Sequence, residues 1–84
     1  MSENQTKQDN SAAVEIGRRL KVLRVERGMM TKDVCEKAGI RPSTLTAIEE
    51  GRYNTGIRQI TDIAHALGAH VEIVPDEPPI RNYI

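Results

Sequence analysis

The sequence predicts an all-α domain of four to five helices, followed by one short β-strand that pairs across a dimer. Apolar residues recur three and four positions apart in four segments between residues 12 and 68, the spacing of helices with one buried face. A glycine follows each segment, where a left-handed residue readily ends a helix. The chain then changes to β-branched residues, which are typical of a strand.

The first two predicted elements are a polar tail and a helix. Residues 1–11 are polar and show no periodicity, so they predict a disordered tail. Helical spacing of apolar residues begins at Ala12, with Ser11 as a candidate N-cap and Gly28 as a candidate stop. This helix opens a domain that we expect to span residues 12–68.

Three shorter helices complete the predicted domain. The second spans residues 31–38, and the third begins at Pro42, whose missing N–H suits the first position of a helix. The third helix ends at Gly51. After a short loop, the fourth helix spans residues 57–67 with a clear apolar stripe.

Residues 69–75 predict a strand, because Val71, Ile73 and Val74 are β-branched and a proline ends the run. A lone strand leaves its backbone N–H and C=O groups unpaired. We therefore expect these three residues to mediate dimerisation, by pairing with the same strand of a second copy across a two-fold axis. The alternative is an extended tail packed on its own helices. Residues 76–84 are rich in proline and predict an irregular tail.

Composition argues against several classes of function. No run of about 18 apolar residues suggests a membrane span, and no secretory signal precedes the domain, so we expect a cytoplasmic protein. The single cysteine, Cys35, falls on the inner face of the second helix, where a buried thiol is the usual outcome. His65 and His70 have no further ligands at metal-binding spacing. The sequence thus predicts no enzyme, metal or cofactor.

Charge is distributed unevenly along the chain, although the formal net charge is zero. Residues 16–58 carry ten Lys and Arg against five Asp and Glu, whereas residues 1–15 have a net charge of −2 and residues 59–84 of −3. A basic middle segment is typical of a face that binds a polyanion. Ordinary solvated helix faces would give the same pattern, so charge alone does not separate the two interpretations.

The second and third predicted helices, joined by a tight turn at Gly39, have the arrangement of a helix-turn-helix unit. Such a unit presents small or polar side chains of its second helix to the major groove of DNA. Ser43, Thr44 and Thr46 provide hydroxyl groups that can donate to or accept from bases and phosphates. The weak helix formers at this position therefore favour a surface that contacts DNA.

Four stretches together resemble the lambda-repressor-like, or xenobiotic-response-element, helix-turn-helix family. They are IGRRLKVLR, DVCEKAGI, LTAIEEG and IAHALG, in that order between residues 16 and 68. The resemblance implies a sequence-specific regulator of transcription in which Arg24 and Glu49 form a structural ion pair. It also implies a set of residues that contact double-stranded DNA: Thr31, Arg41, Ser43, Thr44, Thr46, Ala47, Arg52, Tyr53 and Asn54.

One departure from the family pattern bears on this set. Met30 stands where the family usually has a Ser or Thr that caps the second helix. Thr31 then becomes the candidate for the cap, which would make it less free to contact DNA.

Two functions follow from the resemblance. The leading hypothesis is a repressor that acts as a homodimer on a palindromic operator, with half-sites about 34 Å apart. The alternative is an antitoxin-type protein that binds and neutralises a partner toxin and regulates its own operon, because antitoxins resembling the persister type combine this domain with a C-terminal strand. Both interpretations require double-stranded DNA and a second copy of the chain as partners.

Overall fold

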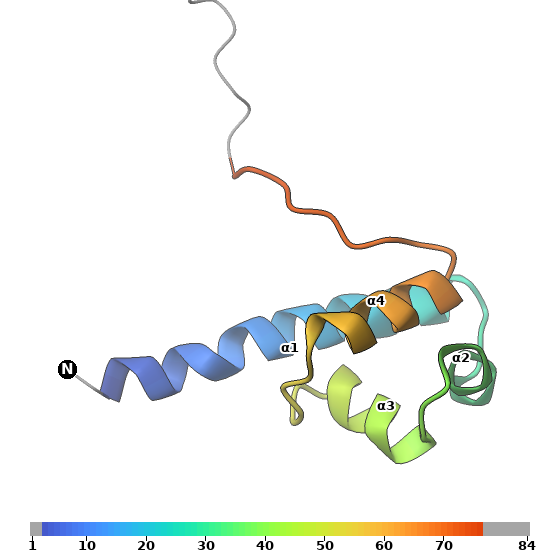
Figure 1. The fold of residues 1–84 in the computed structure, drawn as a ribbon, viewed down its shortest axis with the longest axis horizontal. Coiled ribbons are helices and arrows are strands. Elements are labelled where there is room, and N and C mark those ends of the chain that lie inside the picture. Colours follow the sequence, from blue (N-terminus) through green and yellow to red (C-terminus); the bar gives the residue numbers. More distant parts are fainter. Residues whose placement is uncertain (1–2, 77–84) are drawn as a thin grey trace, which may run out of the picture.

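The computed structural model of the protein describes the backbone of residues 3–76 and the side chains of residues 11–76. Four helices follow one another along this part of the chain: α1 (Glu3–Glu26), α2 (Thr31–Ala38), α3 (Pro42–Glu49) and α4 (Ile57–Ala66) (Figure 1). The all-α helix-turn-helix prediction is confirmed, with four helices.

The first helix is longer than the sequence predicts. α1 begins at Glu3, so the disordered tail predicted for residues 1–11 is wrong for residues 3–11, and Ser11 lies inside the helix instead of capping it. Residues 3–11 contain no glycine or proline that would end a helix. The later turns of α1, around Gly17 and Leu20, are fixed by packing. Each residue added to the helix toward its N-terminus then gains one backbone hydrogen bond. Figure 1 shows the first turns of α1, in blue, extending beyond the other helices.

The other three helices begin where their start signals predict, at Thr31, Pro42 and Ile57. α2 ends at Gly39, which has a φ of 72°, and the N–H of Gly39 donates to the Cys35 carbonyl at 2.8 Å. Its left-handed backbone ends the helix and leaves a short turn before α3 begins at Pro42.

The core lies where the four helices meet. α2, α3 and α4 each contribute at least one fully buried side chain, and α1 contributes one that is 8% exposed. The buried hydrophobic residues are Leu20, Val34, Cys35, Leu45, Ile48, Ile63, Ala64 and Leu67. α3 therefore packs against α1 and α2 through one side and leaves its other side open.

α1 and α3 lie in close contact at Gly17. A Cβ atom built on this glycine would lie 2.0 Å from the carbonyl oxygen of Ile48, far inside van der Waals contact. Gly51, which follows α3, has a φ of 75°, and a Cβ there would lie 2.8 Å from Cγ2 of Val14. Two glycines thus allow the C-terminal half of α3 to rest directly on α1.

Residues 69–76 follow α4 as an extended segment, drawn in orange in Figure 1. The stretch that the structure describes contains no strand, so the strand predicted over residues 69–75 does not form within one chain. A strand requires a partner edge, and every other element here is a helix. Ile73 is 95% exposed and Val74 68% exposed, so the packed-tail alternative does not hold for them either. Pairing across a dimer stays a prediction, and the tail predicted for residues 76–84 lies, beyond Asp76, outside the described residues.

Candidate nucleic-acid interface

The outward side of α3 carries most of the residues that the sequence assigns to DNA. Arg41, Ser43 and Thr46 are exposed, and Thr44 and Ala47 are partly exposed. We call these five residues the α3 face. The opposite side holds Leu45, Ile48 and Glu49, all buried, so the helical period separates the two sets cleanly.

Arg41 occupies the N-cap of α3. Its backbone is extended, with φ −83° and ψ 149°, and its carbonyl accepts hydrogen bonds from the N–H groups of Thr44 and Leu45 at 3.0 and 3.1 Å. The side chain makes no capping bond, and no carboxylate of residues 11–76 pairs with it. An exposed guanidinium therefore stands at the positive end of the helix dipole, a combination that attracts phosphate.

Thr31 lies at the start of α2 and does not serve as its cap. The N-cap is Met30, whose backbone N–H donates to Oδ2 of Asp33 at 3.1 Å. The expectation that Thr31 takes over the cap is therefore wrong, because the helix already includes Thr31 and the N–H groups of Asp33 and Val34 donate to the carbonyl of Met30. Thr31 is the first helical residue and is partly exposed.

The loop after α3 places Arg52, Tyr53 and Asn54 on the surface. The Nε of Arg52 donates to Oε1 of Glu50 at 2.8 Å, and both side chains are more than half exposed. Such an exposed pair contributes little energy, so it orients the guanidinium without preventing contact with a phosphate. These residues follow the C-terminal end of α3, whereas Arg41 precedes its N-terminal end, so candidate contacts flank the whole helix.

An ion pair between Arg24 of α1 and Glu49 of α3, largely shielded from solvent, attaches α3 to the rest of the protein. The Nε and Nη2 of Arg24 donate to the two carboxylate oxygens of Glu49 at 2.8 and 3.2 Å, and its Nη1 donates to the carbonyl of Met29 at 3.0 Å. The side chains are 14% and 6% exposed. The hydrogen bond to Glu49 raises the pKa of Arg24. Arg24 therefore joins the end of α1, the turn before α2 and the end of α3 through one guanidinium.

The thiol of Cys35 lies buried in the core. Burial raises the pKa of the Cys35 thiol, and the negative charge of Glu49 adds to this effect. A buried thiol with a raised pKa is a poor nucleophile. Within residues 11–76, no three His, Cys, Asp or Glu side chains come together as a metal would need. None of the helices in the same part of the chain has the length and apolar character required to cross a membrane.

Sequence reasoning missed two residues that shape this surface. Gly17 sets the contact between α1 and α3, and its signal was a glycine isolated within a helical pattern, which often marks a close approach. Glu50, the C-cap of α3, pairs with Arg52, and its signal was an acidic residue two positions before an arginine.

Comparisons with known proteins agree with this geometry. A family model described as a helix-turn-helix domain matches residues 15–74. The immunity repressor of Bacillus phage phi105 is 36% identical over 62 residues, which cover 74% of this chain and 43% of the repressor. The chain thus spans less than half of that relative. An uncharacterized HTH-type transcriptional regulator of Archaeoglobus fulgidus is 32% identical over 54 residues, covering 64% of this chain and 77% of the regulator.

Two solved structures are similar in fold. The restriction-modification controller protein C.AhdI from Aeromonas hydrophila has a TM-score of 0.68 and 27% identity, covering 71% of this chain and 91% of the controller. The clp gene regulator ClgR from Corynebacterium glutamicum also has a TM-score of 0.68 and 27% identity, covering 70% of this chain and 76% of that chain.

Proposed function

Because the chain belongs to the helix-turn-helix family of DNA-binding transcription regulators, we propose that it represses transcription by binding a palindromic operator as a homodimer. One observation carries this proposal. The five residues of the α3 face are exposed or partly exposed, while the Arg24–Glu49 pair and the Gly17 contact fix the helix behind them. A surface that is both uncovered and rigidly held suits recognition of another molecule.

The α3 face suits the major groove through its small side chains. Ser43, Thr44 and Thr46 allow the backbone to approach base edges, and threonine methyl groups can contact the methyl group of thymine. Arg41 is the one long cationic side chain of the α3 face, and it can bind either a phosphate or a guanine. Recognition would then depend on DNA shape and bridging water together with a few direct contacts.

Thr31, Arg52, Tyr53 and Asn54 would contact the phosphate backbone on either side of the α3 face. These contacts would position the protein without reading sequence. In a two-fold dimer the two copies of α3 would enter successive major grooves, about 34 Å apart, so the operator would be a palindrome. We expect the protein in the cytoplasm, together with the DNA it would bind.

The test is a titration by fluorescence anisotropy with DNA from upstream of the protein's own gene, against scrambled DNA of equal length. We expect tighter binding to the native fragment, with a logarithmic salt slope of about −0.9 for each phosphate neutralised. Equal and weak binding to both fragments would argue against an autoregulatory repressor. Co-purification from cells that express the neighbouring genes tests the antitoxin role, which no observation here favours on its own.

A further inference from the structure

An open hollow of about 590 Å³ is shared by three helices. Arg41 and Thr44 of the α3 face line it from α3, Gln59 lines it from α4, and Glu36 lines it from α2. The turn between α2 and α3 completes the lining. Two residues of the α3 face therefore border the same space as Gln59, a polar residue that the sequence did not assign to DNA.

The amide group of Gln59 is held by a residue just before α4. The hydroxyl of Thr55 donates to Oε1 of Gln59 at 2.5 Å, and both side chains are partly exposed. This bond engages the carbonyl end of the amide and leaves the two N–H groups of Nε2 as donors. Within residues 11–76, no acceptor takes either of them.

The donors that the α3 face contributes to the hollow are also uncommitted. In the part of the chain whose side chains are described, neither the guanidinium of Arg41 nor the hydroxyl of Thr44 forms a hydrogen bond. Side-chain amides, hydroxyls and guanidinium groups are the donors that contact phosphate oxygens in protein–DNA complexes. A phosphate diester offers only acceptors, so it complements these three groups.

Glu36 is the one lining residue that opposes a phosphate. Its carboxylate is exposed, and no Lys or Arg among residues 11–76 pairs with it. Glu36 and Arg41 together give the lining a formal charge of zero, so net charge does not draw a polyanion to the hollow. A phosphate there would depend on the positioned donors, and Glu36 would weaken its binding by repulsion.

We propose that the hollow receives a phosphate of the DNA backbone, to which Gln59 donates beside Arg41 and Thr44, and that Glu36 limits the affinity. The proposal rests on the DNA binding of the proposed function and adds two residues that determine its strength. Gln59 extends the contact from α3 to α4, so one phosphate is held by both helices. Such a contact positions the protein on DNA of any sequence.

Gln59→Met tests the donor, because methionine has a similar length and lacks both N–H groups. Binding is measured by fluorescence anisotropy at low salt, with the upstream fragment and with scrambled duplex. We expect about tenfold weaker binding to both duplexes, the value of a hydrogen bond to a charged group at a partly exposed site. The salt slope and the Tm should not change, since the lost group is neutral and exposed to solvent in part. An unchanged affinity would overturn the proposal.

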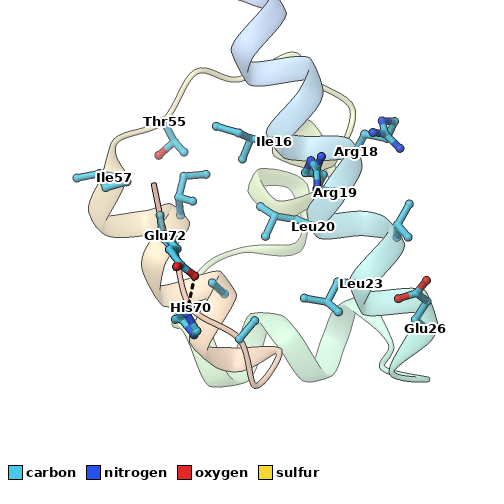
Figure 2. A pocket seen from close by; sticks show the side chains of 15 residues that line it. Ile16, Arg18, Arg19, Leu20, Leu23, Glu26, Thr55, Ile57, His70 and Glu72 are labelled. Carbon is cyan, nitrogen blue, oxygen red and sulfur yellow. Dashed lines mark hydrogen bonds and ion pairs between the residues drawn. The ribbon is translucent and has the colours of Figure 1, made fainter. Parts of the chain in front are cut away.

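Glu36→Gln tests the opposing charge and should have the opposite effect, with about threefold tighter binding to both duplexes. Its matched control is Glu26→Gln, which removes an exposed carboxylate from the separate groove between α1 and α4, where α3 contributes no residue (Figure 2). Equal gains from the two variants would mean that charge acts only at long range, which would contradict a phosphate in the hollow.

The double variant, Gln59→Met with Glu36→Gln, tests whether both residues act on one phosphate. The gain from Glu36→Gln should become smaller in the absence of Gln59, because the phosphate is then no longer held beside residue 36. Strictly additive effects would contradict a shared phosphate.

The two duplexes separate this proposal from the repressor. Phosphates are the same in every duplex, so scrambled DNA tests the hollow whatever the operator is. A natural protein that binds both duplexes equally would refute the autoregulatory repressor, and the affinities of the variants would still decide the hollow. A preference for the upstream fragment, with equal affinities for the natural protein and Gln59→Met, would refute the hollow alone.

Discussion

Substituting Gly17 with alanine adds one methyl group at the point where α1 touches α3, and we expect it to destabilise the protein. The new Cβ would lie 2.0 Å from the Ile48 carbonyl oxygen, whereas ordinary contact begins at 3.4 Å. The backbones must therefore separate locally by about 1.4 Å. Neither atom belongs to a flexible side chain, so no rotamer change can relieve the contact.

Two opposing effects determine how much Gly17→Ala changes the free energy of unfolding. Alanine favours a helix over glycine by about 1 kcal/mol, which stabilises α1. Overpacking of a fixed interface costs about 1–3 kcal/mol, and a gap of 0.5–1 Å already removes about a quarter to a half of the dispersion energy at a contact. A contact of 2.0 Å with a backbone oxygen places the overpacking cost at the upper end of its range, so we expect a net loss of about 2 kcal/mol. Each kcal/mol lowers the Tm by about 4–8 °C in a domain of this size.

Urea and thermal unfolding, followed by far-UV circular dichroism, measure this loss. Lys21 is an exposed residue of the same helix, so the difference between Lys21→Ala and Lys21→Gly gives the helix propensity term alone. Gly17→Ala should be less stable than the natural protein although alanine is the more stable residue at position 21. A Gly17→Ala protein as stable as the natural one, or more so, would refute the close approach of α1 and α3.

Four further predictions concern the ion pair, the α3 face, the thiol and the extended segment. Glu49→Gln should destabilise the protein by about 3–5 kcal/mol, because it leaves the nearly buried Arg24 without its counter-charge. Glu15→Gln, at an exposed pair, is the control, and similar unfolding curves for the two variants would contradict the assigned role of Glu49. Arg41→Ala should weaken operator binding by about 1–3 kcal/mol without a change in Tm, whereas Lys21→Ala should bind normally, both by anisotropy. An unchanged affinity would remove Arg41 from the interface. Cys35 is 5% exposed and burial raises its thiol pKa, so maleimide should label it slowly in the native protein and faster in Gly17→Ala. Rapid native labelling would mean that α2 does not hold Cys35 in the core. A chain that ends at Gly68 should be monomeric in analytical ultracentrifugation, and a dimer that persists would exclude residues 69–76 from the interface.

The parts of the fold that sequence predicted well depend on local signals. Gly39 and Pro42 each restrict the backbone at one position, so the end of α2 and the start of α3 could be read without tertiary information. Polar composition predicts a disordered tail over residues 3–11, but this stretch contains no helix-breaking residue and α1 extends through it.

The remaining features require knowledge of which segments meet. Arg24 and Glu49 are 25 positions apart, and only the resemblance to a family suggested their pairing. Gly17 has no local role that distinguishes it from other helical glycines, because its importance arises from the crossing of α3. The predicted strand does not form within the chain because a strand needs a second extended segment beside it, and the described residues offer none. Exposure of the α3 face agrees with its predicted role but does not by itself identify the bases it would contact.

The separation of α3 into two sides has an evolutionary consequence. Leu45, Ile48 and Glu49 carry its attachment to the rest of the protein, and Ser43 and Thr46 carry none of it. Substitutions at positions 43 and 46 can therefore accumulate without loss of stability, so a duplicated gene could acquire a new operator while keeping the same scaffold. Libraries confined to these positions should yield folded proteins at high frequency, and under the proposed function we expect the variants to differ in the DNA they prefer.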